Sequence, residues 1–276
     1  MNDSTTQQPM VLQGEGPVLL TLHTGGVAHV RLNRAESANG LNIELLKALH
    51  EVLMQIHGDG RVRAVLITGA GKNFCAGGDV HTFLSKGEQL PDYIRVATSY
   101  LQLVASLLIR MNPPVVSAVQ GFAAGGGGMG LVCSSDFVIA GESSRFLAGA
   151  TRVAMVPDAG VSVTLTQLVG LRKATEILML NPVITAPEAK AMGLVTRVVP
   201  DAGLENEAWA LARQLAEGAP AALANTKRLL WSGIGQGVEA AMPEENSTQA
   251  LLSGMADARE GLAAVIEKRA PRFTGR

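Results

Sequence analysis

The fold of this chain is decided by the stretch PPVVSAVQGFAAGGGG, residues 113–128. Apolar, mostly β-branched residues after Pro114 predict a short buried strand, and the glycine run at 125–128 predicts a loop that leads into a helix. Residues 66–80, LITGAGKNFCAGGDV, repeat the same order of strand, glycine loop and helix. Backbone amides at a helix start point outward with the positive end of the helix dipole behind them. Each loop is therefore suited to hold an anion.

Glycine in such a loop has a second interpretation, because it also permits tight turns and close helix packing. For either loop alone the two interpretations are equally good. Neither loop is a dinucleotide fingerprint, since the first lacks the third glycine, and neither is a P-loop, since no Gly-Lys-Ser/Thr follows. If the two loops converge in space, their amides would form an oxyanion hole, which stabilises negative charge that develops on a carbonyl oxygen.

Working outward, the chain alternates strands and helices up to Pro200, which predicts an α/β fold. The expected elements are a hairpin over 17–31, helices over 42–57, 93–111 and 125–132, and strands over 62–68, 114–119 and 136–140. Asn42 is the expected N-cap of the first helix. Beyond Pro200 the strand pattern stops, and helices are expected over 204–217, 220–232, 236–253 and 257–269. We therefore predict a catalytic core at 1–200 and a helical region at 201–276.

Composition excludes several classes of protein. The 276 residues carry a net charge of −1 and no cluster of Lys or Arg, so neither a nucleic acid nor a membrane surface is the expected partner. No apolar run reaches the roughly 18 residues that cross a bilayer. Cys75 and Cys133 lie far apart without metal-ligand spacing, which predicts neither a metal site nor a disulfide framework and fits a reducing cytoplasm. A small-molecule substrate is the better expectation.

Several segments, taken in order, resemble signatures of the crotonase (enoyl-CoA hydratase/isomerase) superfamily. Besides the two glycine stretches, these segments are LNRAESANGLN (32–42), VPDAG (156–160), AMGLVTRVVP (191–200) and EKRAPRFTG (267–275). The resemblance implies a spiral of ββα units, with a C-terminal helical region that assembles a homotrimer or a dimer of trimers and covers the CoA site. It also implies an acyl-CoA thioester as substrate, with no separate cofactor because coenzyme A is part of that substrate.

The same resemblance assigns roles to individual residues. Gly78 and Gly126 would donate their amides to the thioester oxygen. The CoA contacts that it implies are Arg34 at the phosphates, Ala76, Gly77 and Asp79 in the first loop, and Lys268 and Phe273 in a tail that reaches the CoA of a neighbouring subunit. Asp79 is also the expected cap of the next helix, and for the tail a solvated surface is the simpler interpretation.

The acid/base positions depart from the hydratase pattern. Where hydratases of the family carry two glutamates, this chain has Met129 and Ala150, which cannot activate water. Asp158 instead matches the catalytic acid of the family's isomerases, and its motif is most similar to that of epoxyphenylacetyl-CoA isomerases and enoyl-CoA isomerases. Met129 and Ala150, with Met155 and Val156, are expected to form an apolar wall that raises the pKa of Asp158. The alternative is that Asp158 only caps the helix that begins near residue 160.

The predicted function is thus an acyl-CoA isomerase. It would move a double bond, or rearrange a ring, by proton transfer through a thioester enolate held in an oxyanion hole. Two alternatives stay open from the sequence. One is a hydratase-like lyase or acyl-CoA hydrolase with other acid/base residues, and the other is a non-catalytic acyl-CoA-binding protein.

Overall fold

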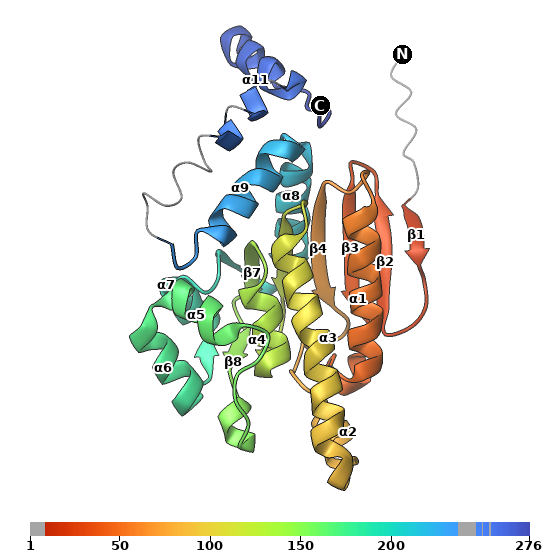
Figure 1. The fold of residues 1–276 in the computed structure, drawn as a ribbon, viewed down its shortest axis with the longest axis vertical. Helices are drawn as coiled ribbons and strands as arrows, with labels where there is room; N and C mark the ends of the chain where they lie inside the picture. The colour runs from red at the N-terminus through yellow and green to blue at the C-terminus, as the bar shows by residue number, and fades with distance from the viewer. Residues whose placement is uncertain (1–8, 237–246, 250, 254) are drawn as a thin grey trace.

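The computed structural model describes residues 9–236, 247–249, 251–253 and 255–276, and its main feature is a twisted seven-stranded sheet (Figure 1). The strands of this sheet, in spatial order, are β1 (Met10–Gln13), β2 (Val18–His23), β3 (Val27–Leu32), β4 (Ala64–Gly69), β5 (Val115–Val119), β7 (Phe137–Gly141) and β10 (Arg197–Val199). The first three strands are antiparallel, and every pair from β3 onward is parallel. The predicted hairpin is confirmed as β2 and β3, whose turn contains Gly25 and Gly26. Strand β1 was missed, because it is a short edge strand with Met10 and Val11 exposed.

Helices cover both faces of the large sheet. Helices α1 (Ile43–Gly58) and α3 (Leu90–Arg110) pack on one face, and α8 (Leu204–Glu217) packs on the other. Along β4, Val65 and Ile67 enter the core under α1 and α3, whereas Ala64 and Leu66 enter the core under α8. This period of two places apolar residues on both sides, as expected of a strand in a covered parallel sheet.

Two successive ββα units build the part of the fold that carries the glycine loops. Strands β5 and β6 (Phe122–Ala124) lead into α4 (Gly125–Cys133), and strands β7 and β8 (Arg145–Leu147) lead through η3 (Ala150–Val153) into α5 (Val161–Val169). Strand β8 pairs with β6 on one side and with β9 (Ile184–Thr185) on the other, which forms a second, small sheet. The predicted spiral of ββα units is confirmed, although β6, β8 and β9 are too short to be seen in the sequence pattern.

The region after Pro200 is helical, as predicted. Helix α8 and helix α9 (Pro220–Ser232) match the expected ranges, α11 spans Ala256–Glu267, and most of the helix expected over 236–253 lies outside the described residues. Because α8 forms its own hydrophobic core with β4, β5 and β7, the boundary predicted at residue 200 does not separate two cores. Helix α11 lies beyond the upper ends of α8 and α9 in Figure 1. None of the described helices is long and apolar enough to span a membrane.

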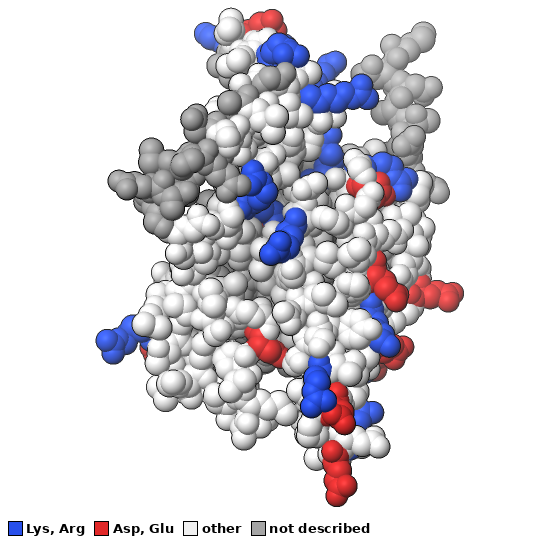
Figure 2. Space-filling view, viewed as in Figure 1, with Lys and Arg blue, Asp and Glu red and all other residues white. Residues whose placement is uncertain are grey.

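Large apolar side chains are exposed on α5 and α6 (Leu171–Leu180). They include Val163 and Leu168 on α5, and Leu171, Met179 and Leu180 on α6, of which Leu171 is 72% exposed. Figure 2 shows few charged side chains over the corner where Figure 1 places these two helices. A monomer rarely leaves a contiguous apolar face of this kind in water. The self-association predicted for the C-terminal helices therefore extends, as a prediction, to α5 and α6.

We predict that the protein is a trimer or a dimer of trimers, and light scattering at micromolar concentration measures this directly. The variant Leu171→Glu/Met179→Glu places two charges on the α6 face and is expected to shift the assembly toward monomers. Glu51→Lys on the exposed side of α1 is the control and should leave the mass unchanged. A wild-type protein that is monomeric under these conditions would contradict the prediction.

Candidate active site

The two glycine loops lie against each other. Gly77 has a positive φ of 94°, and a side chain there would place its Cβ 2.7 Å from the carbonyl oxygen of Ala124 and 2.9 Å from the Cα of Gly125. Behind this contact, the Ala124 amide donates to the Cys75 carbonyl at 2.9 Å. Only glycine allows the two backbones to approach this closely. The convergence that an oxyanion hole requires is therefore present.

The amides of Gly78 and Gly126 are placed to act as donors. Gly126 lies in the first turn of α4, where an N–H has no acceptor inside its own helix. On the first loop, Leu41 bonds to both neighbours of Gly78: its amide donates to the Gly77 carbonyl at 2.7 Å, and its carbonyl accepts from the Asp79 amide at 3.0 Å. The amide of Gly78 consequently points away from Leu41.

A cavity of about 470 Å³ opens beside these two amides. One side is formed by α2 (Val80–Leu84) and α3, and the opposite side by residues 147–158. Most of the lining is apolar, and Asp158 is the only carboxylate among the described residues that line it, while Arg152 is the only cation. The apolar lining residues on the α1, α2 and α3 side are Leu41, Leu46, Val80, Phe83, Leu84, Leu90, Ile94, Ala97 and Leu101.

Asp158 places its carboxylate directly over Gly126. A Cβ on Gly126 would overlap Oδ1 of Asp158 and would lie 2.5 Å from its Cγ. Oδ1 is buried and has no hydrogen-bond partner among the described residues. Burial raises the pKa of Asp158, and a hydrogen bond from its own backbone amide offsets this only in part. A carboxylate in this environment accepts a proton more readily than one in water.

The alternative that Asp158 is only a helix cap is wrong. Helix α5 is preceded by Gly160 and has no side-chain capping bond. The link between Asp158 and α5 is made by its backbone, whose carbonyl accepts from the Val161 amide at 3.0 Å. The carboxylate is thus free of any structural hydrogen bond to the helix and faces the cavity.

Three of the four residues that were expected to form an apolar wall beside Asp158 are in place. Ala150, Met155 and Val156 line the cavity with Asp158. Met129 does not, which corrects the prediction: it lies one turn after Gly126 in α4, but its side chain is fully buried in the main core. Position 129 still provides no acid/base group, because the side chain of methionine is a thioether.

Arg34 and Asp79 form an ion pair behind the first glycine loop, with Nη2 of Arg34 at 3.0 Å from Oδ2 of Asp79. Asp79 also caps α2, since its Oδ1 accepts from the Thr82 amide at 3.0 Å, so the predicted cap is confirmed. Burial raises the pKa of Asp79, but the hydrogen bonds from Thr82 and Arg34 outweigh it and leave the pKa below its ordinary value. The charge of Arg34 is compensated inside the chain, and its contact with CoA phosphates stays a prediction.

The tail residues lie away from this cavity. Phe273 packs against Gly261 of α11 and lines a separate cavity with the start of α9, whereas Lys268 is exposed. Asp257 fixes the tail, because its carboxylate accepts from the amides of Thr274 and Gly275, both at 2.7 Å. Within one chain the described tail does not cover the glycine-loop cavity. Its contact with the CoA of a neighbouring subunit stays a prediction.

Asn39 is a supporting residue that the sequence interpretation did not single out. It is fully buried with a positive φ of 54°, and its Nδ2 is directed at the carbonyl oxygens of Ala70 at 2.9 Å and Asn73 at 2.8 Å. Its Oδ1 accepts from the Arg34 amide at 2.9 Å. These bonds hold residues 34–40 against the first glycine loop. The pair Asn-Gly at 39–40 is the available signal, because it favours a left-handed backbone.

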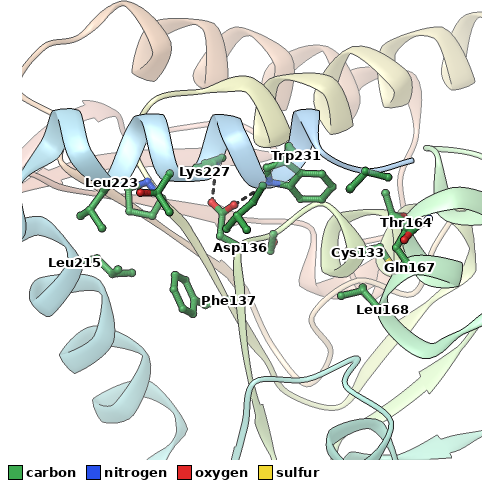
Figure 3. A pocket seen from close by; sticks show the side chains of 15 residues that line it. Cys133, Asp136, Phe137, Thr164, Gln167, Leu168, Leu215, Leu223, Lys227 and Trp231 are labelled. Atoms are coloured by element: carbon green, nitrogen blue, oxygen red, sulfur yellow. Dashed lines mark hydrogen bonds and ion pairs between the residues drawn. The ribbon is translucent and has the colours of Figure 1, made fainter. Parts of the chain in front are cut away.

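A second cavity, of about 390 Å³, lies between α9, β7 and α5 (Figure 3). Its charged groups are paired: Nζ of Lys227 lies 2.7 Å from Oδ2 of Asp136 and donates to the Leu108 carbonyl at 2.6 Å, and Nε1 of Trp231 donates to Oδ1 of Asp136 at 3.1 Å. This network holds α9 on the body of the protein. Burial raises the pKa of the Cys133 thiol in its wall to about 12, so the thiol is not a nucleophile. The glycine-loop cavity is therefore the better candidate.

Gly78 and Gly126 line one cavity, and beside them stands the partly buried carboxylate of Asp158, whose Oδ1 has no hydrogen-bond partner among the described residues. Groups of these two kinds in one cavity are what enzymes use to stabilise an oxyanion and to transfer a proton. The chain belongs to the enoyl-CoA hydratase/isomerase family, whose sequence model matches residues 23–276.

Individual relatives extend over nearly the whole chain. The 1,2-epoxyphenylacetyl-CoA isomerase of Escherichia coli is 32% identical over 252 residues, which are 91% of this chain and 96% of that protein. The crystal structure of an enoyl-CoA hydratase from Bacillus anthracis superposes with a TM-score of 0.89 at 32% identity, covering 95% of this chain and all of that one (100%). An enoyl-CoA hydratase from Polaromonas sp. JS666 gives a TM-score of 0.89 at 29% identity, covering 94% of this chain and 100% of that one.

Proposed function

We propose that this protein is an acyl-CoA isomerase that uses Asp158 to transfer a proton between two carbons of the acyl group. The observation that supports this most directly is the position of Asp158. It is the one carboxylate among the described residues of the cavity, and its Oδ1 stands over Gly126 without a hydrogen-bond partner among the described residues. One carboxylate is sufficient for a proton shuttle, because the group that removes the proton also returns it.

The reaction follows from the geometry. The thioester carbonyl oxygen accepts from the amides of Gly78 and Gly126. Asp158 removes a proton from the carbon next to the carbonyl, and the electron pair of the broken C–H bond moves onto the thioester as an enolate whose negative charge the two amides stabilise. The protonated carboxyl, which can exchange its proton with solvent, then returns a proton two carbons along, and the double bond ends beside the carbonyl. Apolar side chains predominate in the lining, which strengthens the carboxylate as a base.

Hydration is the second candidate function, because most of the similar proteins carry hydratase names. A two-carboxylate hydration needs one group to activate water and another to return a proton. The two expected glutamate positions hold Met129 and Ala150, and Asp158 is the only carboxylate among the described residues of the lining. The isomerase named among the relatives supports a proton-transfer chemistry for chains of this kind.

The test is a panel of unsaturated and aromatic acyl-CoA thioesters followed by mass spectrometry in deuterated water. An isomerase leaves the mass of the product unchanged apart from deuterium taken up from solvent. A hydratase adds one water, a hydrolase releases free CoA, and a binding protein changes nothing. Product one water heavier as the dominant outcome would overturn the isomerase proposal.

The pH profile gives an independent check. Asp158 must be ionised to accept the proton, so kcat/KM should fall as the pH is lowered through its pKa. Because burial raises that pKa, the fall should begin at a higher pH than an ordinary carboxyl with a pKa near 3.8 would give. Because the phosphate monoester of CoA itself titrates at about pH 6, kcat at saturating substrate is measured together with kcat/KM between about pH 3 and 9, and an acid limb that appears in both is assigned to the enzyme. An acid limb at the ordinary carboxyl value would contradict a desolvated base.

A further inference from the structure

The side of the cavity that carries Asp158 has little packing of its own. Residues 149–158, here called the wall segment, include seven that line the cavity: Gly149, Ala150, Arg152, Val153, Met155, Val156 and Asp158. Their only regular structure is the short η3, and Thr151 to Ala154 are exposed to solvent. Exposed segments with few buried apolar contacts open easily unless other bonds hold them. Bonds to other parts of the chain must therefore hold the wall segment in place.

One residue outside the wall segment makes most of the polar contacts to it. Asn181 is only 3% exposed, and its Oδ1 accepts from the Gly149 amide at 2.6 Å. Its Nδ2 donates to Oγ1 of Thr151 at 2.5 Å. Its backbone carbonyl accepts from the guanidinium of Arg152. A single side chain and its carbonyl thus bind three of the first four residues of the wall segment.

The backbone of Asn181 explains why asparagine suits this position. It is the C-cap of α6, with a φ of 50° in the left-handed region, and its amide donates to the Ile177 carbonyl at 3.2 Å. Glycine and asparagine adopt this conformation at the lowest cost. Glycine at this position would keep the helix end, but it has no side-chain amide group to bond with the Gly149 amide and the Thr151 hydroxyl. Asparagine therefore ends the helix and holds the wall segment at the same time.

The bonds continue from this anchor to the carboxylate. Within the wall segment, the Met155 amide donates to the Ala150 carbonyl at 3.1 Å, and on the far side the Asp158 carbonyl accepts from Val161 at 3.0 Å. Asp158 is thus suspended between the start of α5 and the part of η3 that Asn181 holds. The carboxylate occupies the space directly above Gly126. A small shift of the wall segment would therefore move Asp158 away from the substrate carbon whose proton it is proposed to remove.

We infer that Asn181 is a positioning residue that holds the wall segment so that Asp158 stays in place over Gly126. The inference rests on the proposed function, because the group that is positioned is the proposed proton shuttle. Asn181 itself is not among the residues that line the cavity.

The test replaces Asn181 by glycine, which keeps the left-handed backbone and removes only the side chain. We expect kcat to fall by about tenfold to a hundredfold, since misplacement of a catalytic group by about 1 Å has effects of this size. Binding of a saturated acyl-CoA, which cannot isomerise, should change much less. The acid limb of kcat/KM should also move to lower pH, because water admitted around Asp158 relaxes its raised pKa.

Two further variants keep the result interpretable. Thr151→Val changes an exposed residue and removes the hydroxyl that accepts from the Asn181 side chain and donates to the Leu178 carbonyl of α6. It should give the same changes at smaller size even if Asn181→Gly does not fold. Ile56→Val, in the core near the far end of α1, lowers stability without touching the wall segment and should leave kcat and the acid limb unchanged.

The failures of the two proposals can be told apart. If Asp158→Asn retains full activity, the proposed function fails. If Asp158→Asn is inactive but Asn181→Gly and Thr151→Val keep the wild-type kcat and acid limb, the role of Asn181 alone is overturned. Equal kcat losses in Ile56→Val and Asn181→Gly would also overturn it, because the effect would then follow from stability.

Discussion

Asp158→Asn is expected to reduce turnover by about a hundredfold to ten-thousandfold while acyl-CoA binding is retained. Asparagine has nearly the same shape, so the cavity and the amides of Gly78 and Gly126 are preserved, but it cannot accept the proton. The measurement is deuterium incorporation from solvent at the carbon next to the thioester, with wild type and variant in parallel. Equal exchange in the two proteins would remove Asp158 from the mechanism, and the proton carrier would have to be sought elsewhere.

The same variant has an expected effect on stability that separates a catalytic from a structural role. The pKa of Asp158 is raised in the folded state, so this group stabilises the fold at low pH and loses that contribution as the pH rises through the folded pKa. At neutral pH the ionised carboxylate, which burial separates from water, lowers the free energy of unfolding. Asp158→Asn should therefore have an equal or higher melting temperature at pH 7, which is the pattern of a residue kept for function. A clear loss of stability would indicate a structural role.

The sequence predicts the large elements of this fold and the two glycine loops for a physical reason. Long amphipathic helices such as α1, and buried strands such as β4, show a periodic pattern over many residues. The hairpin turn and the caps Asn42 and Asp79 depend on bonds between near neighbours in the chain. Local rules are sufficient for such features.

Features that depend on contacts between distant segments were not accessible in this way. The small sheet is held by pairs such as β8 with β9, in strands of two or three residues that have no pattern of their own. The direction of Met129 depends on how α4 packs into the core, and the partner of Arg34 lies 45 residues further along the chain. Asn181 and the Gly149 amide are 32 residues apart. In each case tertiary packing decides which groups meet.

The position of the carboxylate over Gly126 predicts an unusual effect of a small substitution. Alanine at position 126 should be compatible with the backbone conformation, since Gly126 is not among the residues with positive φ. Within a helix, alanine is more favourable than glycine by about 1 kcal/mol. The three atoms nearest to the added Cβ all belong to the Asp158 carboxylate. The methyl group must therefore displace Asp158 while the amide of residue 126 is kept. We expect turnover to fall by about a hundredfold or more, because the shuttle leaves its position.

A double-mutant cycle with Asp158→Ala tests the cause. In the wild-type background Gly126→Ala should lower the free energy of unfolding, because the added methyl group collides with the carboxylate. In the Asp158→Ala background the carboxylate is absent, and Gly126→Ala should raise the free energy of unfolding by up to about 1 kcal/mol. The residual activity of Asp158→Ala should fall little further when Gly126→Ala is added. Gly58→Ala, at the end of α1 where an added Cβ meets nothing within 4 Å, gives the ordinary effect of this substitution in a helix. Chemical denaturation and turnover of the four proteins complete the cycle. Losses of the same size in both backgrounds would show that the carboxylate does not stand over Gly126, and the proton shuttle proposed for this site would lose its geometric basis.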